Sequence, residues 1–164
     1  MATRLLFTLL CVLLPSCGYQ VLQPSLGAGQ SIWVPTATNH SHWHGMEASF
    51  TQSLRKELVG LWDLRLKENK DADLILTSHL RHIRRGAAVS GKGGTILAGR
   101  AYLQADWILT HANGAQLAEG SLSRTLEFLP QNGEDTYSAA DKIIAELTEQ
   151  IAMETGLSLR PSKL

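Results

Sequence analysis

Apolar side chains recur at spacings of three and four over two segments of the chain, which is typical of amphipathic helices. The first segment covers about residues 43–61, and Gly60 is expected to cap its C-terminal end. The second opens at about Ser138, which forms an approximate capping box with Asp141, and Gly156 is expected to end it. The two apolar stripes consist of Trp43, Met46, Phe50, Leu54, Leu58 and Leu61, and of Ala140, Ile143, Ile144, Leu147 and Ile151.

Four other segments carry the patterns of β-strands. Residues 31–34 form a short apolar run that Pro35 ends. From Leu74 the apolar period changes to two, and two further strands are predicted over about residues 95–111 and 116–128. Glycine-rich residues 91–94 and the pair Asn113-Gly114 predict the hairpin turns. The predicted inner faces are Leu74, Leu76, Ser78, Leu80 and His82 on one strand, and Ala101, Leu103, Ala105, Trp107 and Leu109 on the next.

The order of these elements is β-α-β-β-β-α, and each helix has a single apolar stripe. The simplest fold that buries both stripes places both helices on one face of the sheet. The sequence therefore predicts an α+β two-layer sandwich with a four-stranded, mostly antiparallel sheet. The predicted domain covers residues 30–156, and residues 157–164 are expected to form a flexible tail. The second face of the sheet is left bare, and it must meet water or a partner.

The first sixteen residues have the three parts of a secretory signal: a basic start at Arg4, an apolar run over residues 5–14, and Ser16 before the cut. The stretch Leu14-Pro15-Ser16-Cys17 resembles the lipobox of bacterial lipoproteins. The resemblance implies S-diacylglycerol and an N-acyl chain, typically palmitate, on Cys17, with residues 17–29 as a lipidated anchor and tether. Gly18 in place of Asp implies sorting to the outer membrane. The alternative is an ordinary secretory signal that contains a cysteine.

Composition narrows the classes of function. The chain has 15 basic and 15 acidic residues, and removal of Arg4 with the leader leaves 14 against 15. This near-neutral balance argues against a nucleic-acid-binding protein, which usually has a basic excess. The chain has two cysteines, and one of them, Cys11, lies in the leader. The mature chain is therefore expected to have no internal disulfide.

Basic residues gather around the first predicted hairpin. Arg84, Arg85, Lys92 and Arg100 are expected to cluster near one end of the sheet, where guanidinium groups would bind lipid phosphates. Two alternatives stay open. The charges would protect an exposed hairpin, or they would pair with acidic groups of a partner.

A second candidate site is the alternating segment His40-Ser41-His42-Trp43-His44, because imidazole is a common zinc ligand. His40, His42 and His44 would be the ligands, with Glu47 as a possible fourth. The alternative is a loop that leads into the first helix, and no metal or other cofactor is the preferred expectation. The sequence carries none of the common nucleophile, phosphate-loop or zinc-protease motifs, so no enzyme is predicted.

Several short motifs together resemble the LptE family of lipopolysaccharide-assembly lipoproteins. They are Cys17-Gly18-Tyr19, Val34-Pro35, Asn39 and Asp71-Ala72-Asp73-Leu74-Ile75-Leu76. The resemblance implies the two-layer fold predicted above and no catalysis. It also implies an anchored protein on the periplasmic side of the outer membrane that plugs the LptD β-barrel, assists its assembly and helps to deliver lipopolysaccharide. Two other functions stay open: an anchored activator of cell-wall synthases and a metal-binding lipoprotein.

Overall fold

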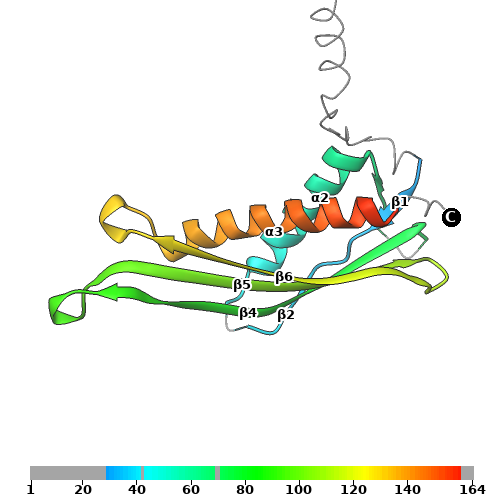
Figure 1. Cartoon of the computed structure of the whole chain (residues 1–164). Coiled ribbons are helices and arrows are strands. Elements are labelled where there is room, and N and C mark those ends of the chain that lie inside the picture. The colour runs from blue at the N-terminus through cyan, green and yellow to red at the C-terminus, as the bar shows by residue number, and fades with distance from the viewer. Residues whose placement is uncertain (1–28, 42, 69–70, 160–164) are drawn as a thin grey trace, which may run out of the picture.

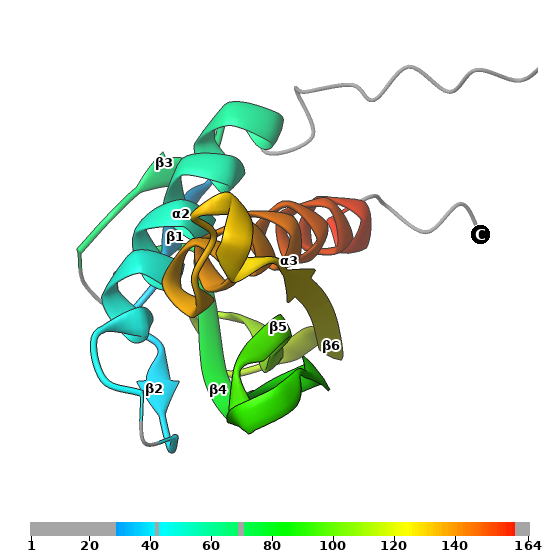
Figure 2. The ribbon, with the colours of Figure 1, turned by 90° about the vertical axis from the view of Figure 1, so that its left-hand side faces the viewer.

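Two helices cover one face of a β-sheet, as Figures 1 and 2 show. The computed structural model describes residues 29–41, 43–68 and 71–159. The helices are α2 (Met46–Trp62) and α3 (Thr136–Ser158). The strands are β1 (Ser31–Trp33), β2 (Thr38–Asn39), β3 (Arg65–Leu66), β4 (Leu74–Ser90), β5 (Ile96–His111) and β6 (Gln116–Phe128), and 3-10 turns lie at Lys92–Gly94 and Pro130–Asn132. The predicted α+β sandwich with both helices on one face is confirmed.

The sheet has six strands rather than the predicted four. Five of the strands follow the order β3-β1-β4-β5-β6. The sixth strand, β2, lies outside this order and pairs with β4. β1 and β2 run parallel to β4, whereas β4, β5 and β6 form an antiparallel meander. The additional strands β2 and β3 have two residues each. The predicted order β-α-β-β-β-α holds for the longer elements.

The side chains of β5 alternate between the two faces of the sheet. Ala101, Leu103, Ala105, Trp107 and Leu109 are buried under the helices, as predicted. They pack against Phe50, Leu54, Leu58 and Trp62 of α2 and Ile143, Leu147 and Ile151 of α3. Complete burial of one such side chain contributes about 1.5–3 kcal/mol. This core holds the layers together and leaves the opposite face bare.

A β-bulge in β4 corrects the predicted face of His82. Leu80 pairs with Ala105, but the next pair is His82 with Gln104, so Arg81 is an extra residue. The bulge reverses the alternation. His82 therefore lies on the bare face with Gln104, and Ile83 lies on the helix side, where it packs against the core.

The N-cap of α3 lies three residues before the predicted one, because the capping box differs from the predicted one. Asp135 is the N-cap, and its Oδ1 accepts from the backbone N–H of Ser138 at 2.7 Å. The Ser138 hydroxyl accepts from the backbone N–H of Asp135 at 3.1 Å. Ser138 is thus the third helical residue rather than the cap, and the predicted pairing with Asp141 is wrong.

The two glycines expected to end the helices lie inside them. α2 continues past Gly60, and Asp63 adopts the left-handed conformation instead. α3 continues past Gly156, which is buried against the indole of Trp62. A Cβ at residue 156 would lie 1.9 Å from Cε2 of Trp62, whose Nε1 donates to the Ala152 carbonyl at 2.6 Å. Gly156 therefore allows the close approach of α2 and α3.

The two helical glycines give a matched test of this packing. We expect Gly156→Ala to lower the free energy of unfolding by about 1–3 kcal/mol, because the methyl group overpacks the core. We expect Gly60→Ala to raise it by up to about 1 kcal/mol, because no atom would lie within 4 Å of the new methyl and alanine favours the helix. Urea unfolding of both variants measures the difference. A stabilised Gly156→Ala variant would contradict the packing.

Candidate functional site

The face of β4, β5 and β6 that points away from the helices is the candidate site, and we call it the open face. Tyr102, Gln104 and Asp106 of β5 lie on it. They are directly opposite Thr125, Ser123 and Ser121 of β6, respectively. The residues here are mostly polar, in contrast to the helix-covered face of the same strands. Within the described residues, no helix covers this face (Figure 2).

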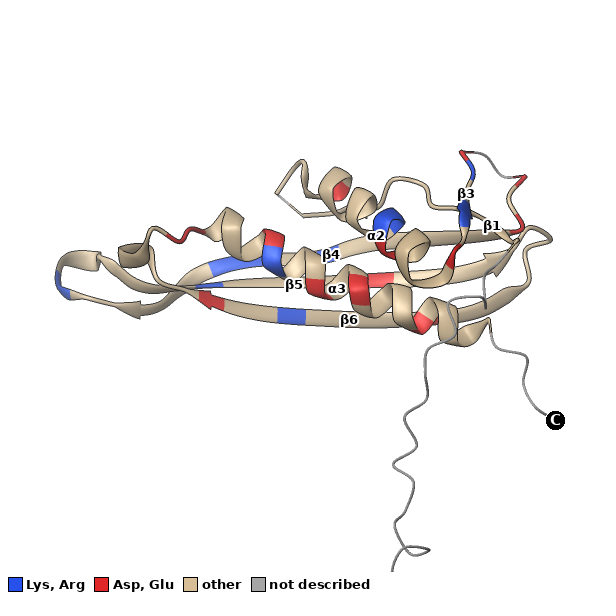
Figure 3. Cartoon of the chain, turned by 90° about the horizontal axis from the view of Figure 1, so that it is seen from above, with Lys and Arg blue, Asp and Glu red and all other residues tan. Residues whose placement is uncertain are grey.

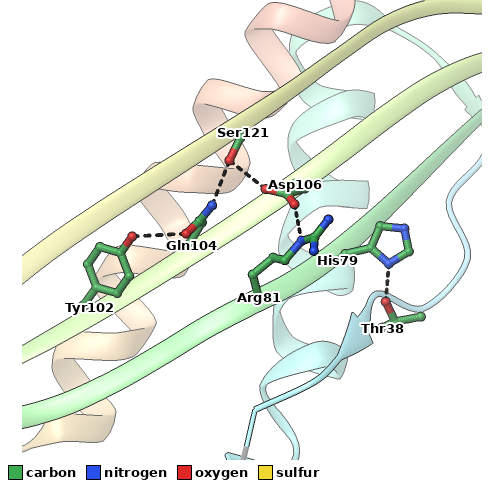
Figure 4. A network of polar contacts seen from close by, with 7 residues as sticks. All are labelled: Thr38, His79, Arg81, Tyr102, Gln104, Asp106 and Ser121. Carbon is green, nitrogen blue, oxygen red and sulfur yellow. Dashed lines mark hydrogen bonds and ion pairs between the residues drawn. The ribbon is translucent and has the colours of Figure 1, made fainter.

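A chain of polar contacts crosses the open face (Figure 4). Arg81 forms an ion pair with Asp106. The Ser121 hydroxyl donates to Oδ1 of Asp106 at 2.7 Å and accepts from Nε2 of Gln104 at 3.0 Å. The Tyr102 hydroxyl donates to Oε1 of Gln104 at 3.3 Å. These contacts join three strands, so the side chains are held in place before any ligand arrives.

Asp106 is held in its ionised form by this network. Its partial burial would raise the pKa, but the hydrogen bonds from Ser121 and Arg81 and the positive charge of Arg81 bring the pKa below its ordinary value. The carboxylate is thus engaged as an acceptor rather than poised to transfer a proton. Beside it lies an open hollow of about 710 Å³, lined by His79, His82 and Glu119 as well as by the network. This arrangement is suited to binding polar groups.

His79 links the open face to the strand beside it. Its ring nitrogen Nδ1 shares a hydrogen bond with the Thr38 hydroxyl, which fastens β2 against β4 (Figure 4). His79 and His82 both lie on the open face.

Three of the four predicted phosphate-binding residues, Arg84, Arg85 and Arg100, line one hollow in the structure. Arg84 pairs across the sheet with Tyr102, and Gly86 pairs with Arg100. Arg84 and Arg100 therefore lie on the open face, where they line a second hollow of about 440 Å³ with Tyr102 and Thr125. Tyr102 and Thr125 were not predicted, since only the cross-strand register reveals them.

Arg85 lies on the other face of the sheet. It pairs with Ala101, which is buried under the helices. Its guanidinium lies 5.5 Å from the centre of the Trp43 ring, and Trp43 stacks on Tyr137 with ring centres 5.3 Å apart. Such cation–π contacts stabilise by about 0.5–2 kcal/mol. Arg85 thus borders the same hollow as Arg84 and Arg100, but its guanidinium fastens the hairpin to the helix layer.

Lys92 lies apart from the arginines at the tip of the hairpin. The tip lies beyond the last pair, Ser90 with Ile96, so Lys92 is more than about 13 Å along the strands from Arg100. This end of the hairpin projects past the helices (Figure 1). Residues 74–105 contain five arginines and lysines and no aspartate or glutamate. Figure 3 accordingly shows a blue segment and no red one at the tip.

The two open-face arginines differ in their partners. Arg100 donates to Oε1 of Glu127 from Nη2 at 2.7 Å and from Nε at 3.2 Å. Arg84 has no acidic partner within the described residues. Both side chains are exposed, so Arg84 is the guanidinium that is free to bind an incoming anion.

Glu47, the possible fourth ligand of the predicted metal site, is engaged in other hydrogen bonds. Its carboxylate accepts from Asn39 Nδ2 at 2.9 Å and from the Gly45 backbone N–H at 3.0 Å. The Asn39 bond and the backbone bonds lower the pKa of Glu47. His40 and His44 are exposed, and His42 lies outside the described residues, as does the predicted lipidation site Cys17. Across the described ranges, no three His, Cys, Asp or Glu side chains form a set of metal ligands.

Residues 29–154 match the family described as "LptE: Lipopolysaccharide-assembly". The chain belongs to the LptE family. This match covers the two-layer domain almost entirely and confirms the resemblance drawn from the motifs. LptE proteins are lipopolysaccharide-assembly lipoproteins and not enzymes, which agrees with the non-enzymatic prediction.

Solved structures of other proteins, two of them lipoproteins, share this fold at low sequence identity. A protein from Xanthomonas campestris is 11% identical, with a TM-score of 0.62 over 80% of this chain and 86% of its own. An uncharacterized lipoprotein B from Nitrosomonas europaea is 13% identical, with a TM-score of 0.55 over 85% and 90%. A minor lipoprotein from Acinetobacter baumannii is 13% identical, with a TM-score of 0.53 over 78% and 93%. These similarities show the fold alone, and no curated protein matches the chain.

Neither α2 nor α3 is a candidate for crossing a bilayer. In the part of the chain that the structure describes, no helix combines the length and the apolar character that a membrane span needs.

Proposed function

We propose that this LptE protein is an outer-membrane lipoprotein that plugs the LptD β-barrel, assists its assembly and takes part in delivering lipopolysaccharide to the cell surface. The observation that carries the proposal is the family match over residues 29–154. The lipobox-like leader supports anchoring through acylated Cys17 on the periplasmic side of the membrane. In this proposal the lipid holds the domain at the membrane, and the sandwich makes the specific contacts.

The chemistry of the open face supports a polar partner. The lumen of an outer-membrane barrel is polar and hydrated, in contrast to its lipid-facing wall. The open face presents amide, hydroxyl, carboxylate and guanidinium groups that are already held by one another. Such a surface loses little conformational entropy when it binds a polar wall. We therefore assign the open face to contact with the barrel.

Arg84 is the residue to which we assign a lipid phosphate. It lies beside Arg100 and Tyr102 at the hollow near the projecting hairpin, and no described acidic side chain neutralises it. Exposed Val89, Ile96 and Leu97 lie farther along the same hairpin, with exposed fractions of 52%, 48% and 46%. Cationic and apolar groups side by side match the phosphates and acyl chains of lipopolysaccharide.

Affinity purification from native outer membranes in mild detergent tests the proposed function. We expect an LptD-type barrel to be recovered with the full-length chain. Recovery of a peptidoglycan synthase without a barrel would favour the alternative of a cell-wall synthase activator. A preparation of folded chain that carries no barrel would reject the proposal.

Comparison of two single variants, Arg84→Gln and Arg85→Gln, tests the phosphate site. Each substitution removes one positive charge, so the two variants have the same net charge. We expect Arg84→Gln to weaken lipopolysaccharide binding about tenfold or more, since a hydrogen bond to a charged group contributes about 1.5–3 kcal/mol. Arg85→Gln should change the affinity less than about threefold, because that guanidinium lies over Trp43 on the other face. Binding of the purified full-length variants is measured at low and high salt. Equal losses for both variants would remove Arg84 from the site.

A further inference from the structure

Most of the arginine and acidic side chains of the open face are paired with one another. These side chains are Arg81, Arg84, Arg100, Asp106, Glu119 and Glu127. Arg81 pairs with Asp106, and Arg100 pairs with Glu127 at 2.7 Å. Neither Arg84 nor Glu119 has an ion-pair partner within the described residues. The open face is thus left with two free charges of opposite sign.

Arg84 and Glu119 are too far apart to neutralise each other. Arg84 pairs across the sheet with Tyr102, whereas Glu119 pairs with Ile108, farther along β5 toward the β5–β6 turn. The two charged residues are therefore separated by about 20 Å along the strands and by about 10 Å across them. This separation exceeds the Debye length of about 8–10 Å, so their attraction is largely screened. Each charge must be compensated separately, by water or by a partner.

Glu119 borders the larger hollow of the open face, which has a volume of about 710 Å³. Asp106 borders the same hollow, but its carboxylate is already engaged by Arg81 and Ser121. Among the residues that line this hollow, two have carboxylates, one has a guanidinium, and none is a lysine. The hollow therefore has one carboxylate more than its own arginine can pair with.

Contact with a barrel wall changes the surroundings of Glu119. In the isolated chain this residue is exposed, so water solvates the carboxylate. A wall that covers the open face removes this water, and an ionised group that loses its water without a compensating charge is strongly destabilised. The wall must therefore supply a cation at this position, or the carboxyl must take up a proton.

We propose that a cationic side chain of the barrel's lumen wall, an arginine or a lysine, enters the larger hollow and forms an ion pair with Glu119. This inference rests on the proposed function and adds the chemistry that the partner presents to the open face. The polar network holds the other groups of the hollow in place, as Figure 4 shows for Gln104, Asp106 and Ser121. The incoming cation thus meets a free carboxylate beside hydrogen-bonding groups that are already positioned.

The ion pair also gives the open face a direction. The free carboxylate lies toward the β5–β6 turn, and the free guanidinium of Arg84 lies toward the projecting β4–β5 hairpin. A domain turned end for end would bring Arg84 toward the cation of the wall, and opposition of like charges disfavours that orientation. The pair with Glu119 therefore selects the orientation in which the domain enters the barrel.

Competition between two tagged copies of the full-length chain for the barrel tests the proposal. A wild-type copy and a variant copy with a different tag are produced together, and the barrel recovered with each tag from outer membranes in mild detergent is quantified. We expect Glu119→Gln to recover at least about tenfold less barrel than the wild-type copy, because the cation of the wall is left unpaired. Glu119→Lys should recover still less, since like charges then meet.

Glu149 of α3 provides the matched control. It is exposed and has no ion-pair partner within the part of the chain that the structure describes, and it lies in the helix layer. Glu149→Gln and Glu149→Lys make the same changes in charge, and both should recover as much barrel as the wild-type copy. Circular dichroism of the purified variants verifies their fold, and Glu119→Gln decides if Glu119→Lys does not fold.

The outcomes separate this inference from the proposed function. Equal or greater recovery of the barrel by Glu119→Gln would overturn the inference, because the carboxyl would then enter the contact as a neutral acid or lie outside it. Equal losses for the Glu119 and Glu149 variants would also overturn it, since the net charge alone would then matter. If the wild-type copy recovers no barrel at all, the proposed function itself is rejected, and the inference with it.

Discussion

The pairing of β5 with β4 and β6 fixes which side chains face the helices and which face away, and the rest of the structure depends on that division. Because side chains alternate along a strand, every second residue of β5 is committed to the core. The register then aligns the polar residues of three strands on the opposite face. A shift of one residue would bury Asp106 and expose Trp107. The apolar core and the polar open face are thus two results of the same pairing.

The part of the fold that follows from local periodicity was predictable. The apolar stripes of both helices and the alternation of β5 are regular. The turns of the β4–β5 and β5–β6 hairpins also consist of turn-forming residues. Features that depend on distant partners were not predictable. Gly156 reads as a helix end in the sequence, but the Trp62 indole from α2 explains it. The bulge at Arg81 has no local signature, and it reverses the faces of His82 and Ile83.

The candidate site, too, could be predicted only in part from the sequence. Arg84 and Arg85 are adjacent in the sequence, yet the strand directs them to opposite faces. Three of the four predicted residues, Arg84, Arg85 and Arg100, line one hollow, but the Arg85 guanidinium lies over Trp43 on the other face and Lys92 lies at the tip. Tyr102, Thr125 and the Asp106–Ser121 contact come from strand register, which a single sequence does not encode visibly. Likewise, the sequence offered Asn39 only as part of a motif. The structure gives it a structural role, because its side chain donates a hydrogen bond to Glu47.

The chain belongs to the LptE family, its apolar core is self-contained, and we propose that its polar open face contacts a partner. Photo-cross-linking in native outer membranes tests that division most directly. Tyr102 on the open face and Tyr137 at the start of α3, which is 67% exposed, are replaced separately by p-benzoylphenylalanine. The account predicts that position 102 cross-links to an LptD-type barrel more strongly than position 137. Cross-linking of the barrel from position 137 with none from position 102 would contradict it.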